Sequence, residues 1–76
     1  MHRSVLHAID SFCIDETELR IKCKMAGLTR IATERMVKRY VFYKSEYEIA
    51  CDESVEVEAI KQSLYRSRKK VYSKEP

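Results

Sequence analysis

The scarcity of turn residues is the feature that most limits what this chain can fold into. Gly27 is the only glycine and Pro76 the only proline among 76 residues. This composition rules out a loop-rich or disordered chain and a glycine-rich phosphate-binding loop. A chain this short has room for one domain, residues 1–76, and buries only about 60% of the surface of its unfolded state. We expect its end, residues 72–76, to be frayed.

Capping residues predict two helices in the first third of the chain. Ser4 can cap a helix over about 4–13. Asp15, with Glu18 three residues later, imitates a capping box and predicts a second helix over about 16–25. A strand stays open for this second segment, because its apolar residues also alternate with bases. The alternating apolar residues are Leu19, Ile21, Cys23 and Met25.

Gly27 marks the next break in the chain. Glycine readily ends a helix in the left-handed conformation, and Thr29 can cap the helix that follows. We therefore predict a third helix over about 29–41. Its core-facing residues recur every four positions: Leu28, Ala32, Met36 and Tyr40.

The second half of the chain shows two further patterns. Residues 42–50 are rich in aromatic and β-branched side chains at alternate positions, which favours a strand or wing. The alternating residues are Tyr43, Tyr47, Ile49 and Cys51. Residues 55–71 then predict a helix with acids at its start and bases at its end, as the helix dipole prefers. The predicted fold class is α+β, mainly helical, with a three-helix core over about 4–41.

The C-terminal helix carries a narrow apolar stripe at helical spacing: Val57, Ile60, Leu64 and Val71. Such a stripe is wide enough to pack on one neighbour. With acids at one end and bases at the other, the helix favours an antiparallel homodimer through residues 55–71. The alternative is that the stripe closes the core of its own chain.

Residues 18–37 resemble a helix-turn-helix, the motif of many DNA-binding regulators. In that family a glycine in the turn is followed by an apolar residue and then by Ser or Thr, as in Gly27, Leu28 and Thr29. With the helix before it and the strand after it, the segment looks like the opening of a winged helix-turn-helix regulator. The resemblance implies that the helix over 29–41 enters the major groove of double-stranded DNA. The implied DNA-binding residues are Thr29, Arg30, Glu34, Arg35, Lys38 and Arg39.

Charge is segregated along the chain. Bases predominate in 20–44 and in 61–76, whereas acids predominate in 10–18 and in 46–58. A basic block can face a nucleic acid, and the bases of 65–72 are interleaved with tyrosines that could stack on single strands. The alternative function is a protein-binding adaptor or inhibitor that uses the acidic block, residues 46–58, or the C-terminal helix. An exposed basic face over 30–39, clear of the acidic block, would favour DNA.

Several other classes of function find no support. The three cysteines, Cys13, Cys23 and Cys51, form no C-x-x-C pair, so we expect buried thiols and neither a metal nor another cofactor. No spacing specifies a catalytic group, and we expect no enzyme. No apolar run approaches the roughly 20 residues of a membrane span, and no signal peptide is recognisable. We therefore expect a cytoplasmic protein without a membrane partner.

Overall fold

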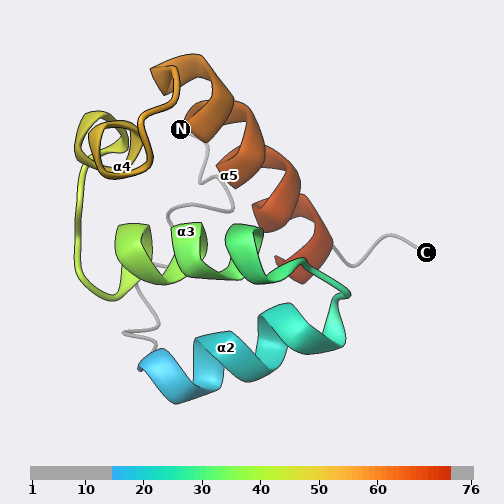
Figure 1. Ribbon diagram of the computed structural model, residues 1–76. Helices are drawn as coiled ribbons and strands as arrows, with labels where there is room; N and C mark the ends of the chain where they lie inside the picture. Colours follow the sequence, from blue (N-terminus) through green and yellow to red (C-terminus); the bar gives the residue numbers. More distant parts are fainter. Residues whose placement is uncertain (1–14, 73–76) are drawn as a thin grey trace, which may run out of the picture.

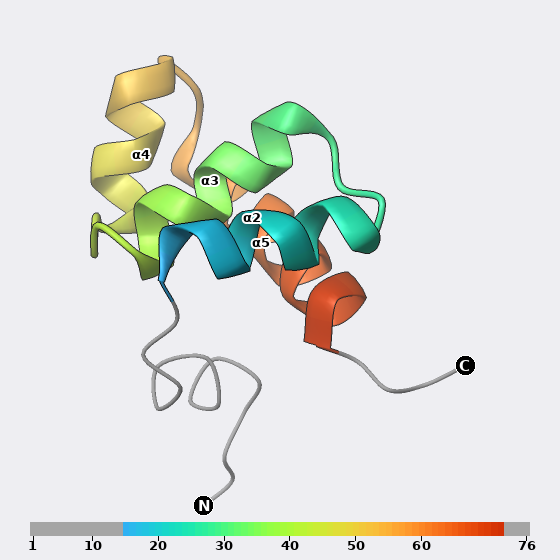
Figure 2. The ribbon, with the colours of Figure 1, turned by 90° about the horizontal axis from the view of Figure 1, so that it is seen from below.

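The fold was analysed in a computed structural model, which describes residues 15–72. Within this range the chain forms four helices and no strand: α2 (Glu16–Met25), α3 (Arg30–Tyr40), α4 (Glu46–Glu53) and α5 (Val57–Tyr72). Helices α3 and α5 each contact the other three (Figure 1). Figures 1 and 2 both show α4 at the end of the bundle that is far from the C-terminal end of α5. The helix predicted over 4–13 lies outside the described residues.

The helix expected over 16–25 is confirmed as α2, and the strand alternative is wrong. The Asp15 side chain accepts a hydrogen bond from the Glu18 backbone N–H at 2.7 Å, which caps the helix. Leu19 and Cys23, four residues apart, are fully buried. Ile21 and Met25 are 54% and 82% exposed. The burial therefore follows a helical period, not the two-residue period of a strand.

A four-residue turn joins α2 to α3. Gly27 adopts a left-handed φ of 80°, and the Leu28 N–H donates back to the Cys23 carbonyl at 3.0 Å. Thr29 then caps α3, because its hydroxyl accepts from the Ala32 N–H at 3.1 Å. The prediction for the third helix is confirmed, with Met36 and Tyr40 buried. Leu28 and Ala32, which complete the predicted apolar side, are only partly buried.

The strand or wing predicted over 42–50 is wrong, and with it the α+β class. Residues 46–53 form α4, whose start is a capping box: the Ser45 hydroxyl accepts from the Glu48 N–H, and the Glu48 carboxylate accepts from the Ser45 N–H. Ile49 and Ala50 are buried, whereas Tyr43 and Tyr47 are 73% and 70% exposed. The alternation failed because only one of its aromatic and aliphatic members faces the core. Within 15–72 the fold is all helical.

The apolar stripe of α5 closes the core of its own chain. Ile60 and Leu64 are fully buried, and Val57 and Val71 pack partly buried against the same core. Ile60 and Leu64 therefore present no surface to a second copy, and the alternative to the predicted dimer interface is the one found. A homodimer stays a prediction and would need another face of the molecule.

The C-terminal end of α5 is also part of the packed structure. Tyr72 belongs to the helix and packs against the core, and the fraying expected over 72–76 stays a prediction. Burial raises the pKa of the Tyr72 phenol to about 12. The Lys22 ammonium lies 5.5 Å from the centre of its ring. Residues 73–76 lie outside the described range.

Candidate nucleic-acid interface

The α3 residues expected to contact DNA divide into two groups. The side chains of two of them, Thr29 and Glu34, form hydrogen bonds within the protein. The Thr29 hydroxyl caps α3. The Glu34 carboxylate accepts from the Arg20 guanidinium, with one N···O distance of 2.7 Å. This pairing holds the pKa of Glu34 below its ordinary value, and it ties α2 to α3.

Arg35 is engaged still more firmly. Its guanidinium forms a bidentate pair with the Glu53 carboxylate, with Nη2···Oε1 at 2.6 Å and Nε···Oε1 at 2.9 Å. Both side chains are more than four-fifths buried, with 17% and 19% exposed. Bidentate Arg–carboxylate pairs with little exposure are among the stronger ion pairs in proteins. Arg35 therefore joins α3 to α4 and is not free to neutralise a phosphate.

The remaining α3 bases are available. Arg30 is exposed, and Lys38 and Arg39 are half-buried. The Arg39 guanidinium lies 5.6 Å from the centre of the Tyr40 ring. None of these three bases forms an ion pair with a carboxylate of residues 15–72. The basic face of 30–39 is therefore only partly free. Its Arg35 is paired with Glu53, which belongs to the acidic block of 46–58.

The acidic block is likewise partly used inside the fold. Glu48 completes the capping box of α4, and Glu53 pairs with Arg35. Asp52 accepts a hydrogen bond from the Lys44 ammonium at 2.8 Å, which lowers the pKa of Asp52 and raises that of Lys44. The carboxylates that keep no such partner in the described part of the chain are Glu46, Glu56 and Glu58. An extended acidic surface is therefore much reduced.

Helix α5 carries the densest set of bases without carboxylate partners. Lys61, Lys69 and the Tyr65 between them are spaced four apart and exposed, and the Lys69 ammonium lies 5.5 Å from the centre of the Tyr65 ring. Arg66 and Lys70 form a second exposed row, one residue further round the helix. The sequence pattern that indicated these residues is the interleaving of bases and tyrosines over 65–72.

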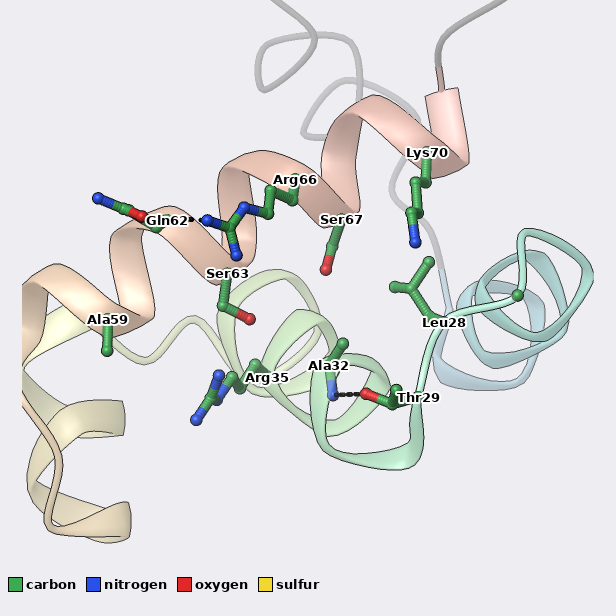
Figure 3. Close-up of a pocket in the computed structure, with 11 residues that line it drawn as sticks. Leu28, Thr29, Ala32, Arg35, Ala59, Gln62, Ser63, Arg66, Ser67 and Lys70 are labelled. Carbon is green, nitrogen blue, oxygen red and sulfur yellow. Dashed lines mark hydrogen bonds between the residues drawn. The ribbon is translucent and has the colours of Figure 1, made fainter.

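The second row of bases borders a groove between α5 and the start of α3, which we call the α3–α5 groove. It has a volume of about 480 Å³, and its α3 side is formed by residues from Gly27 to Arg35. Figure 3 shows the Ser63, Ser67 and Lys70 side chains of α5 directed toward the α3 side. The polar residues that α5 contributes are Gln62, Ser63, Arg66, Ser67 and Lys70. Sequence reasoning did not find this groove, because its two walls are about 35 residues apart.

The described residues offer little else for chemistry. Within 15–72 no three His, Cys, Asp or Glu side chains come together in a group that could hold a metal ion. Cys23 is buried, and burial raises the pKa of its thiol. Cys51 is exposed, so the expectation of a buried thiol is wrong there. Cys13 lies outside the described residues. No helix in the described part is long and apolar enough to span a membrane.

Known proteins add no further constraint on this interface. Comparisons of the chain with family models, with curated proteins and with solved structures find no match.

Proposed function

We propose that this chain is a small cytoplasmic protein that binds double-stranded DNA and regulates transcription by occupying it. The observation that carries the proposal is the pair of basic rows on α5, Lys61 with Lys69 and Arg66 with Lys70, none of which pairs with a carboxylate of the described chain. Unpaired surface bases attract the phosphate backbone and release its counterions on binding. Three acids of the 46–58 block, Glu48, Asp52 and Glu53, are taken up by internal contacts, whereas Glu58 lies beside Lys61 at the start of α5.

Helix α3 contributes the remaining part of the proposed interface. The helix-turn-helix resemblance makes it the recognition helix, and Arg30 is its exposed first residue. An arginine at the start of such a helix can donate two hydrogen bonds to a guanine edge. Lys38 and Arg39 suit phosphate contacts, whereas Arg35 and Glu34 act in the protein itself. The proposal thus assigns phosphate binding mainly to α5 and base reading to Arg30.

Fluorescence anisotropy with a short labelled duplex tests the proposal. The affinity of the wild-type protein should fall steeply between roughly 50 and 200 mM salt. Lys69→Gln should reduce the slope of log affinity against log salt by about one unit, because one phosphate contact is lost. Lys24→Gln is the matched control: it removes one exposed charge from α2 and should leave the slope unchanged.

Two results would reject DNA binding through this surface. One is a wild-type protein that binds no duplex at the low-salt end of the titration. The other is an equal effect of Lys69→Gln and Lys24→Gln, because the affinity would then report net charge and not a surface on α5.

A second candidate function is supported by a different surface. Phe42, Tyr43 and Tyr47 are 58%, 73% and 70% exposed around the start of α4, and Tyr43 has a left-handed φ of 58°. Exposed aromatic residues are common anchors of protein interfaces. The alternative is therefore a protein-binding adaptor that uses this end of the acidic block. DNA would be favoured as the partner of α5 if Tyr47→Ser kept the DNA affinity of the wild type while Lys69→Gln lowered it.

A further inference from the structure

The α3–α5 groove is lined by a serine, Ser67, whose hydroxyl has no hydrogen-bond partner among the described residues. Ser67 is only 4% exposed, and its hydroxyl makes no hydrogen bond within residues 15–72. Figure 3 shows this hydroxyl directed from α5 into the groove. Among the described residues only the Tyr72 hydroxyl is fully enclosed without a partner, so the Ser67 hydroxyl is open to the groove. The Ser67 hydroxyl is therefore available to exchange hydrogen bonds with a group bound in the groove.

The charged groups around Ser67 are positive. Arg66 and Lys70 flank it on α5, and Figure 3 shows the Lys70 ammonium directed toward Leu28 across the groove. The only partner found for the Arg66 guanidinium in the described chain is the Gln62 amide oxygen at 3.3 Å. Of the described residues that line the groove, none is acidic. Glu53, the nearest acid to Arg35, is held by that arginine.

The start of α3 adds a further positive contribution. Thr29 and Ala32 line the groove, so the N-terminal end of the helix lies at its edge. The Thr29 cap takes up the N–H of Ala32. The N–H groups of Arg30 and Ile31 have no acceptor in the described chain, as is usual for the first turn of a helix. Such an end favours anions through its dipole and its free donors.

We propose that the α3–α5 groove is a phosphate-binding site. Two cations, serine hydroxyls and the positive end of a helix are the set of groups that proteins use to bind tetrahedral anions, and the lack of acids excludes a cation as the ligand. The phosphate is either a diester of the DNA backbone or a free phosphate. Only the first of these sources rests on the proposed function.

Titration of the full chain with inorganic phosphate, and separately with a DNA duplex, tests the site by NMR of the backbone amides. Phosphate should shift the amide signals of Arg30, Ile31 and Ser67 in a saturable way if the source is free phosphate. Lys70→Gln and Ser67→Ala should each weaken binding of the true ligand about tenfold, because a hydrogen bond to a charged group is lost. Lys24→Gln is the control for Lys70→Gln, because it removes an exposed charge that lies outside both the groove and the basic rows of α5.

The two titrations separate the proposals. If phosphate does not bind but the groove variants weaken DNA binding more than Lys24→Gln does, the ligand is a backbone phosphate. If phosphate binds and DNA does not, the site stands and the proposed function fails. If the groove variants match the control in both titrations, the site is overturned, even where DNA binding persists. Circular dichroism of each variant confirms its fold, and the exposed position of Lys70 keeps the test decisive if Ser67→Ala does not fold.

Discussion

The corner between α2 and α3 and the corner between α4 and α5 have the same backbone hydrogen bonds but different residues at the key position. In the first, Leu28 donates to Cys23 and Gly27 to Lys24; in the second, Val55 donates to Ala50 and Ser54 to Cys51. Both are Schellman motifs, which end helices with a left-handed residue. That residue is Gly27, with φ 80°, in one corner and Ser54, with φ 57°, in the other.

The difference shows that glycine is a sufficient but not a necessary signal for this corner. A serine in the left-handed region carries a steric cost of roughly 1–2 kcal/mol that glycine avoids. The α4–α5 corner persists because Ile49 and Ala50 before it, and Ile60 after it, are buried in the common core. Packing of the core therefore stabilises the left-handed conformation at Ser54, whereas the local preference of glycine stabilises it at Gly27.

The largest expected effect tests whether α4 is a packed helix. Ile49→Ala should lower the free energy of unfolding by about 2–5 kcal/mol, because it opens a cavity in the core. Tyr47→Ala, at an exposed position, should change it by no more than about 0.5 kcal/mol. Urea denaturation followed by circular dichroism measures both. If both variants lost a similar free energy of unfolding, the predicted strand over 42–50 would be favoured over α4, because residues 47 and 49 share one face of a strand.

Gly27→Ala should be the next largest change. No atom lies within 4 Å of the position that a Cβ would take, so the cost is the left-handed φ alone, about 1–2 kcal/mol. Gly27→Asn is the control and should cost less, because asparagine tolerates this conformation better. If alanine and asparagine were equally costly, the strain of this corner would not lie in φ.

Ser54→Gly should act in the opposite direction. It relieves the strain of the α4–α5 corner but adds freedom to the unfolded chain, so we expect a net gain of about 0.5–1 kcal/mol in the free energy of unfolding. Ser54→Ala keeps the strain and should change stability little. A thermal melt with no increase for Ser54→Gly would mean that the two corners differ in more than their left-handed residue.

The smallest expected effect is on the loss of stability at low pH. The Arg20–Glu34 pair links α2 to α3 and lowers the pKa of Glu34. Because the folded-state pKa lies below the unfolded value, this stabilisation is complete above the ordinary carboxyl range and is lost as pH falls through the lowered pKa. Glu34→Gln should therefore flatten the acid limb of the stability curve slightly and leave the stability of the variant less dependent on pH. An acid limb identical to that of the wild type would show that the pair does not contribute.

Much of the helical framework could be predicted from short stretches of sequence. Asp15, Gly27 and Thr29 indicated the start of α2, the turn and the start of α3 correctly. The capping box of α4 is also present in the sequence as Ser45 and Glu48, but the prediction followed the alternation of residues 43–51 and did not use it. Ser54 left no sign of a corner, because serine gives no preference for a left-handed φ.

The candidate interface was less predictable, because it depends on which bases remain without partners. Arg35 and Lys70 look alike in sequence, yet Arg35 is bound to Glu53 and Lys70 borders a groove. The apolar stripe of α5 shows the same limit. Its spacing fitted a dimer or a closed core equally well, and the burial of Ile60 and Leu64 distinguished them.

The sequence by itself determined the helix starts and the glycine turn, because these depend on hydrogen bonds between residues three to five positions apart. Only the tertiary structure decided which charges are neutralised and where the groove lies. Arg20 meets Glu34 across 14 positions, and Arg35 meets Glu53 across 18. Such pairs form only when packing of the core brings separate helices together, and no local pattern specifies that packing.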